Sequence, residues 1–263
     1  MQQKDIYLPI LEEFCKKNEE ALKTSGYPWS PFIPVTYENY EEGPKIFYLG
    51  IDTYYWGVSS QELLDAFFKN SLDSILEKNN KVVTPKRVLE DWKNDKGLFW
   101  SFVCKLHIFI RSGRLCSNED LRHLSFAEQQ LIEELGYGNM NSIELKKTLE
   151  KEDYWNSINT KKYWELKESS ETLIDPLTNL IKAYMPDYIF ILGWGGNEAH
   201  VFKGMKYTAR ENFYDENYRA VYEFKDFPTK VIWSSHPSRF SFLGTNQEDM
   251  VEYLADTYKK IKG

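Results

Sequence analysis

Two short stretches, far apart in the chain, carry the side chains best suited to chemistry. The first, LGIDTYYWG, places Asp52 directly after an apolar run that ends at Gly50-Ile51. The second, KVIWSSHPSRFSF, places His236 in front of a proline at the end of another apolar run. The residue before a proline is held extended, which fixes the direction of the imidazole and suits a hydrogen-bond donor or acid.

Both turns also have a purely structural interpretation. Aspartate commonly caps a turn or the next helix, and spacing alone favours that role for Asp52. His236 is equally compatible with a loop histidine that bonds to backbone. Around it, Ser235, Ser238 and Arg239 are able to bond phosphate oxygens.

Two more turns follow apolar runs. LGWGGNEAHVFKG contains Gly193 and Trp194 and sets glycines before a helix start, where backbone N–H groups can hold an anion or a carbonyl oxygen. It is neither GxGxxG nor a Walker loop, so it is weak evidence for a nucleotide cofactor. GYGNMNSIEL is predicted to be a short strand followed by a polar loop that carries Asn139 and Asn141.

Several enzyme classes lack their motifs in this chain. GxSxG, HExxH and HxE…CxxC are absent, which disfavours serine hydrolysis, zinc hydrolysis and zinc deamination. The three cysteines, Cys15, Cys104 and Cys116, are scattered and form no CxxC, which argues against a disulfide framework or a four-thiolate site. We expect neither a metal nor a cofactor.

Composition fits a globular α/β protein. The chain has 263 residues, 42% hydrophobic and 16% aromatic, with a net charge of −7. The negative balance argues mildly against a protein that coats nucleic acid, although a local basic patch is compatible with it. The N-terminal stretch is interrupted by charges, so we expect no signal peptide and no membrane span, and therefore a cytoplasmic protein. We also expect a monomer.

Apolar runs at 45–52, 187–195 and just before His236 read as buried strands that alternate with helices. Capping boxes are predicted at Ser59/Glu62, Ser125/Glu128 and Thr245/Glu248. Pro176 should break a helix over 169–186, residues 146–168 are predicted to be an exposed insertion, and the strand before the last buried one is predicted at a sheet edge. Such alternation predicts a mostly parallel sheet whose ligand site lies beyond the carboxyl ends of its strands.

In order and spacing, the turns resemble those of the uracil-DNA glycosylase superfamily. The first stretch resembles its strand followed by G-Q-D-P-Y-H: Gly50, Asp52 and Tyr54 match, and Ile51, Thr53 and Tyr55 differ. The last resembles H-P-S-P-L-S: His236, Pro237, Ser238 and Ser241 match, and Arg239 and Phe240 differ. DYIFILGWGGNEAHVFKG resembles the strand and W-G-x-x-A helix before that motif. The resemblance covers roughly Gly43 to the C-terminus, interrupted between Val82 and Leu135.

The resemblance implies a three-layer α/β/α sandwich with a central, mostly parallel four-stranded sheet. The chain would be a single domain over 1–263, with an N-terminal helical extension over 1–42 and a helical insertion at about 82–135. It also implies base excision repair chemistry, in which a flipped, deaminated or damaged base, uracil-like, loses its N-glycosidic bond. DNA or a nucleotide would be the substrate.

Site roles follow from the resemblance residue by residue. Asp52 would orient water or stabilise the cationic sugar, and His236 would hydrogen-bond the departing base. Asn139, with Asn141 as the alternate, would read the base edge, and Phe240 would be an apolar wedge. Further binding residues would be Gly50, Ile51, Tyr54, Tyr55, Gly193, Trp194, Ser235, Ser238 and Arg239. Trp56 and Phe99 are the candidates for the aromatic side chain that stacks on the base.

A second function class stays open. A non-catalytic protein of the same fold would bind a nucleotide, a nucleic acid or a protein partner. The lost Gln-Pro pair of the first motif and the net charge of −7 favour it. A basic stripe formed by Arg239, Lys203, Lys206 and Arg210 at the mouth of the site would favour the enzyme, and an acidic mouth would favour the binding protein.

Overall fold

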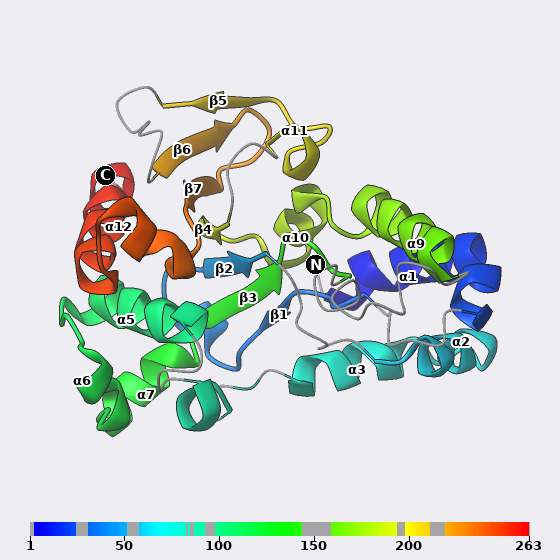
Figure 1. The fold of residues 1–263 in the computed structure, drawn as a ribbon, viewed down its shortest axis with the longest axis horizontal. Coiled ribbons are helices and arrows are strands. Elements are labelled where there is room, and N and C mark those ends of the chain that lie inside the picture. The colour runs from blue at the N-terminus through cyan, green and yellow to red at the C-terminus, as the bar shows by residue number, and fades with distance from the viewer. Residues whose placement is uncertain are drawn as a thin grey trace.

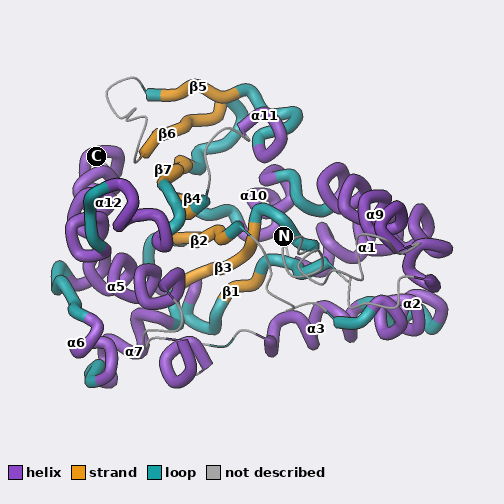
Figure 2. Tube along the Cα trace, viewed as in Figure 1, coloured by secondary structure: helices purple, strands orange, loops and turns teal. Residues whose placement is uncertain are grey.

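A computed structural model describes residues 3–24, 31–51, 58–82, 84, 87–92, 98–143, 159–193, 198–210 and 219–262. In these residues the chain forms one mixed β-sheet with helices on both faces (Figures 1 and 2). The α/β class predicted from the sequence is therefore confirmed. Among the described helices, none is both long and apolar enough to cross a membrane.

The sheet is larger than predicted. Within the described residues it has seven strands in the order β1-β3-β2-β4-β7-β6-β5, where a four-stranded, mostly parallel sheet was expected. The strands are β1 (Val35–Thr36), β2 (Ile46–Gly50), β3 (Leu135–Asn139), β4 (Tyr188–Leu192), β5 (Tyr207–Ala209), β6 (Arg219–Phe224) and β7 (Lys230–Ser234). Only β3, β2, β4 and β7 run parallel; β1, β6 and β5 pair antiparallel.

The strands β2 and β4 carry no charged or strongly polar side chain because both of their faces are covered. In β2, Phe47 and Leu49 belong to the buried cluster on one face, whereas Ile46 and Tyr48 belong to the cluster on the other. This alternation follows from the two-residue period of a strand. It explains why each of these segments reads as a continuous apolar run.

Two groups of helices cover the two faces (Figure 1). One group is α5 (Leu98–Ser112), α6 (Asn118–Arg122), α7 (Phe126–Ile132) and α12 (Gln247–Lys262). The other is α1 (Gln3–Thr24), α2 (Ser60–Phe68), α3 (Asp73–Val82), α9 (Asn159–Leu173) and α10 (Leu177–Tyr184). Short helical segments are η1 (Tyr40–Glu42), η2 (Val88–Trp92), α11 (Glu198–Val201) and η5 (Pro237–Leu243). The helix predicted within residues 1–42 contributes core side chains through Tyr7, Leu11 and Phe14.

Two of the three predicted capping boxes are present in the structure. Both hydrogen bonds of the capping box are present at Ser59/Glu62 and at Ser125/Glu128. The predicted box at Thr245/Glu248 is wrong by one residue. Asn246 instead accepts the backbone N–H of Asp249 over 2.9 Å, and its amide donates to the Asp249 carboxylate. An asparagine serves as a cap as well as a threonine does, so the sequence pattern alone did not separate the two.

Three other expectations concern longer segments. The helix over 169–186 is broken as predicted, because Pro176 stands between α9 and α10. The exposed insertion over 146–168 is wrong where the structure describes it: α9 begins at Asn159 and buries Tyr163 and Leu166 against α1. The predicted edge strand is β6, but β5 pairs outside it, so β6 is an inner strand.

Candidate functional site

The parallel strands end side by side, and we call this line of strand ends the carboxyl edge. Gly50 at the end of β2 pairs with Asn139 at the end of β3. Leu192 at the end of β4 pairs with Ser234 at the end of β7. The turns singled out in the sequence therefore leave the sheet from one edge, as predicted for the ligand side of a parallel sheet.

His236 leaves β7 in an extended conformation, with φ −64° and ψ 139°, as expected before proline. Its Nδ1 lies 2.8 Å from Ser238 Oγ and accepts the Ser238 backbone N–H over 3.3 Å. A neutral imidazole whose Nδ1 accepts carries its proton on Nε2. The half-buried ring is thus held in the tautomer that donates from Nε2.

Phe99, at the start of α5, lies between the ends of β2, β3 and β7. Its ring centroid is 5.9 Å from that of His236, with the planes 19° from parallel, and 5.8 Å from that of Tyr137. A Cβ placed on Gly50 would lie 3.4 Å from Phe99 Cε2. Of the two aromatic candidates for stacking on a base, Phe99 is the one that the structure describes, and it lies at the carboxyl edge.

Asn139 points to the same side as Phe99. Its side chain is buried, with the residue 8% exposed, and Tyr137 Oη donates to Asn139 Oδ1 over 3.0 Å. A Cβ on Gly50 would come within 2.7 Å of the same oxygen, so a glycine is needed there for the amide to fit. The orientation of the Asn139 amide is therefore set by Tyr137 and by the missing side chain of Gly50.

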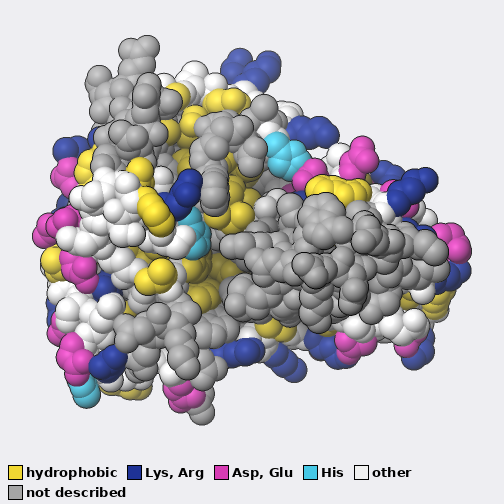
Figure 3. All heavy atoms as spheres, in the orientation of Figure 1, with side chains coloured by type: hydrophobic (Ala, Val, Ile, Leu, Met, Phe, Trp, Pro, Cys, Tyr) yellow, Lys and Arg dark blue, Asp and Glu magenta, His cyan; other side chains and the backbone are white. Residues whose placement is uncertain are grey.

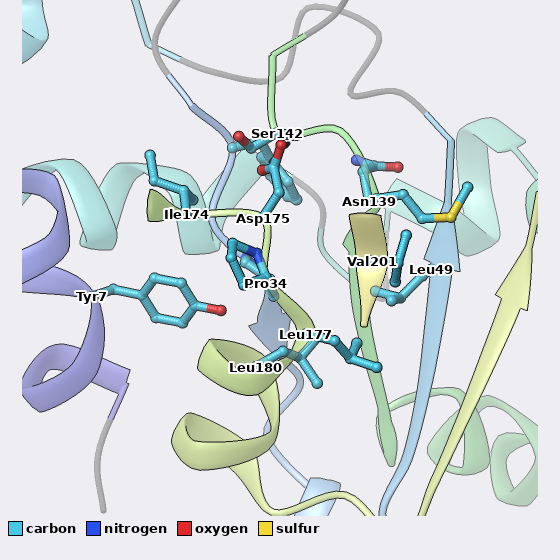
Figure 4. Close-up of a pocket in the computed structure, with 13 residues that line it drawn as sticks. Tyr7, Pro34, Leu49, Asn139, Ser142, Ile174, Asp175, Leu177, Leu180 and Val201 are labelled. Atoms are coloured by element: carbon cyan, nitrogen blue, oxygen red, sulfur yellow. Dashed lines mark hydrogen bonds between the residues drawn. The ribbon is translucent and has the colours of Figure 1, made fainter. Parts of the chain in front are cut away.

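A small pocket lies beside Asn139 (Figure 4). Its volume of about 20 Å³ is enough for roughly one water molecule. Tyr7, Ser142 and Asp175 join Asn139 as its polar lining, and the rest of the lining is apolar. A pocket of this size does not admit a nucleobase, so it is a neighbour of the candidate site and not its ligand cavity.

The two asparagines have different partners. Asn141 Oδ1 accepts from Lys167 Nζ over 2.7 Å, whereas Asn139 Oδ1 accepts from Tyr137. Lys167 belongs to α9 on one face of the sheet, whereas Tyr137 packs with the α5 side. Of the two candidates for reading a base, Asn139 is favoured because it pairs with Gly50 and points to the side of the sheet on which Phe99 lies.

Phe240 does not occupy the position expected of a wedge. It is 2% exposed and packs edge-to-face on Phe102, with ring centroids 5.0 Å apart. The reason is the short helix η5, which turns Phe240 inward against α5. Phe242, two residues later, is 82% exposed, so it is the protruding aromatic side chain of this segment.

The other described candidates line the same turns. Ile51 accepts the Asn141 N–H over 3.0 Å, and Gly193 N–H donates to Ser234 over 2.9 Å. A Cβ on Gly193 would lie 2.4 Å from Met140 Cε, so Gly193 allows Met140 to pack against it. Ser235 is half-buried, and Arg239 is exposed with its N–H bonded to His236 O. Asp52, Tyr54, Tyr55, Trp56 and Trp194 lie outside the described residues.

Charge around the site is mixed. In Figure 3, Asp and Glu side chains on the visible face lie toward its rim, and hydrophobic and His side chains show in the middle. Of the predicted basic stripe, Arg210 is paired with Glu223 over 3.4 Å, and Lys203 and Lys206 are exposed. In the part of the chain that the structure describes, no cluster of three His, Cys, Asp or Glu side chains could hold a metal ion.

Sequence reasoning missed a buried polar cluster next to the end of β3, formed by Lys167, Asp175, Ser142 and Ser170. Lys167, Ser170 and Asp175 lie in a stretch rich in Lys, Glu and Ser, which is the usual composition of a solvated helix face. The available signal was the spacing of Tyr163, Leu166 and Ser170, which lie on one face of a helix.

No protein-family model matches this chain, and no curated protein matches it in sequence. The resemblance to the uracil-DNA glycosylase superfamily therefore stays a prediction from the sequence motifs.

Proposed function

We propose that this protein acts on the N-glycosidic bond of a flat, uracil-like base. The observation that carries the proposal is the arrangement at the carboxyl edge: His236, fixed as an Nε2 donor, lies next to Phe99, which also contacts the end of β2. Asn139, which is a residue able to read a base edge, lies on the same side. These are the groups that such a reaction requires on the base side of the scissile bond.

The chemistry follows from charge separation. As the bond breaks, the base gains negative charge and the sugar gains positive charge. A donor fixed in advance near the base lowers the barrier because it needs no reorientation during the reaction. His236 Nε2 would supply that donor. Asp52, the residue after Ile51, would supply the carboxylate on the sugar side, as the resemblance implies.

Binding of the substrate would use apolar and basic surface near His236. Phe99 would contact the face of the base. Phe242 and Leu98 are exposed large apolar side chains close in sequence to the two halves of the site, and Arg239 is an exposed cation in the same turn as His236. Aromatic side chains combined with arginine suit a strand with unpaired bases.

A non-catalytic binding protein is the second candidate. It is favoured by the net charge of −7 and by the loss of the Gln-Pro pair from the first motif, where the chain has Ile51 and Thr53. A protein of this kind would still use Phe99 and Asn139 to hold a base. It would not depend on Asp52.

The test is base excision. The protein is incubated with single- and double-stranded oligonucleotides carrying uracil, hypoxanthine, xanthine or hydroxymethyluracil, and abasic sites are then cleaved with alkali. We expect His236→Ala to lower the rate by about 10²-fold or more, as for the loss of one fixed donor. His123→Ala, at an exposed histidine paired with Glu119, should leave it unchanged.

If folded wild-type protein cleaves none of these substrates, the proposal that the protein is an enzyme is contradicted. Binding of the same oligonucleotides without cleavage would then support the second candidate. Asp52→Asn separates the two further, because it should abolish cleavage and leave binding intact.

A further inference from the structure

Helix α9 places a buried lysine against the segment that follows β3. The Lys167 side chain is 5% exposed, and its Nζ donates to Asn141 Oδ1 over 2.7 Å. The same Nζ lies 3.1 Å from Glu171 Oε1, one helical turn further on. A buried ammonium group is costly unless it is paired and hydrogen-bonded, so these contacts fix where the side chain lies.

A carboxylate completes the attachment just beyond α9. Asp175 Oδ1 accepts the backbone N–H of Ser142 over 3.1 Å, and Ser170 Oγ lies 3.2 Å from both carboxylate oxygens. The Ser142 and Ser170 hydroxyls are also hydrogen-bonded to each other. We call Lys167, Ser170 and Asp175 the α9 clamp, because together they hold Asn141 and Ser142.

The clamped segment is bonded in turn to the end of β2. Met140 N–H donates to Gly50 O over 2.9 Å, and Asn141 N–H donates to Ile51 O over 3.0 Å. The residue before this segment is Asn139, and the residue after Ile51 is Asp52. A shift of Asn141 would therefore be transmitted to the backbone of Asn139 and of Ile51.

We propose that Lys167 is a positioning residue for the candidate site. By holding Asn141, it fixes the backbone that carries Asn139 and the end of β2 at Gly50 and Ile51, to which Met140 and Asn141 are hydrogen-bonded. Lys167 takes no part in the reaction itself. This inference rests on the proposed function for its catalytic consequence, whereas its structural consequence is independent of that function.

The experiment compares Lys167→Met with Lys161→Met, which lies on the same helix but has an 88% exposed side chain. Two rates are measured on both variants: amide hydrogen exchange at Met140, and single-turnover cleavage of the oligonucleotide that the wild type cleaves fastest. We expect Met140 to exchange at least about 10-fold faster in Lys167→Met. Cleavage should slow by about 10- to 100-fold with KM within about 2-fold, because the geometry of the reacting groups is loosened. Lys161→Met should match the wild type in both.

Unchanged exchange at Met140 in Lys167→Met would overturn the proposal, whatever the activity. Faster exchange with unchanged cleavage would also overturn it, because the clamp would then be structural only. If the wild-type protein cleaves no substrate, faster exchange at Met140 in Lys167→Met still supports the α9 clamp. Only the proposed function is then rejected. Should Lys167→Met not fold, Asn141→Ala removes the acceptor and leaves the Lys167–Glu171 pair in place, and the same rise in Met140 exchange is expected.

Discussion

The two sides of the carboxyl edge surround the strand ends with different kinds of side chain. On the α5 side the surroundings are rings: Phe99, Trp100 and Tyr137 contact one another, and His236 extends the group. Deeper on this side, His107 is fully buried and lies 3.1 Å from Tyr48 Oη, and the buried Lys105 is paired with Glu248 over 2.5 Å. Burial, with a smaller contribution from the charge of Arg111, lowers the pKa of His107 to about 3, so it is neutral at pH 7.

On the α9 side, charges are kept and paired. Lys167 faces Asn141 and Glu171, and Asp175 lies among Ser142 and Ser170. Burial raises the pKa of Asp175, and the neighbouring Lys167 and serine donors oppose that rise. The carboxyl is thus hydrogen-bonded by the Ser142 backbone N–H and the Ser170 hydroxyl and lies near a cation.

The different side chains of the two sides suit them to different tasks. A surface that receives a flat ligand gains from being apolar, and a neutral histidine fits such a surface without an unpaired charge. A side that only has to hold the chain gains from directional bonds, which charged groups make strongest. The α5 side would therefore contact the base, and the α9 side would keep the strand ends in place.

The largest expected effect tests whether packed rings hold the α5 side together. Phe240→Ala removes a side chain that fills the space against Phe102, and should lower the free energy of unfolding by about 3–5 kcal/mol. Phe242→Ala, at the exposed position two residues on, should change it by at most about 0.5 kcal/mol. Urea denaturation of both variants provides the comparison.

Oligonucleotide binding should distinguish the same two variants in the opposite sense, with the larger effect in Phe242→Ala. Phe242→Ala should weaken it, because an exposed aromatic side chain offers a base a stacking surface. An equal loss of stability in both variants would refute the inward orientation of Phe240 and restore it as the wedge.

Much of the carboxyl edge could be predicted because its signals are local. A continuous apolar run followed by glycine or serine marks the end of a buried strand, and β2, β4 and β7 end this way, whereas β3 reads LGYGN and was predicted as a short strand before a polar loop. Parallel pairing then brings the ends together whatever the sequence between them. Gly50 beside Asn139 follows from the register of β2 and β3.

The rest depends on contacts between distant segments. The strand β6 was predicted, but β5, which pairs antiparallel outside it and makes it an inner strand, was not. Lys167 reads as a surface lysine from its charged neighbours in sequence, but in the fold it is buried beside Asn141. Phe240 aligns with a wedge position in the resemblance, but the direction of its side chain depends on η5, which the motif does not specify.

The pH dependence of the free energy of unfolding tests the contrast in charge, with an effect of intermediate size. Unfolded His107 titrates near its ordinary pKa of about 6.5, whereas the folded protein resists protonation down to about pH 3. Stability from this group is therefore full above pH 6.5 and is lost as the pH falls toward 3. Between pH 7 and pH 5 the loss should be about 2 kcal/mol. His107→Gln should flatten this fall in urea denaturation at the two pH values.

Asp175 should respond with the opposite sign. Its pKa is raised in the folded protein, so protonation at falling pH favours the folded state through this group. Asp175→Asn should therefore leave the fall between pH 7 and pH 5 undiminished or make it steeper. A flattening of the fall by Asp175→Asn, matching that of His107→Gln, would erase the contrast between the two sides.

The smallest expected effect tests how finely the α5 side is fixed. Tyr137→Phe removes the hydroxyl that donates to Asn139 Oδ1 and leaves the ring in contact with Phe99 and Trp100. Losing one buried hydrogen bond should cost about 1 kcal/mol in urea denaturation. Tyr207→Phe, at a partly exposed tyrosine on the edge strand β5, should cost nothing measurable. Because the Asn139 amide would lose the donor that orients it, discrimination between uracil and cytosine in oligonucleotide binding should also weaken. If discrimination survives while stability falls, Tyr137 only supports the core, and Asn139 is oriented by the space that Gly50 leaves open.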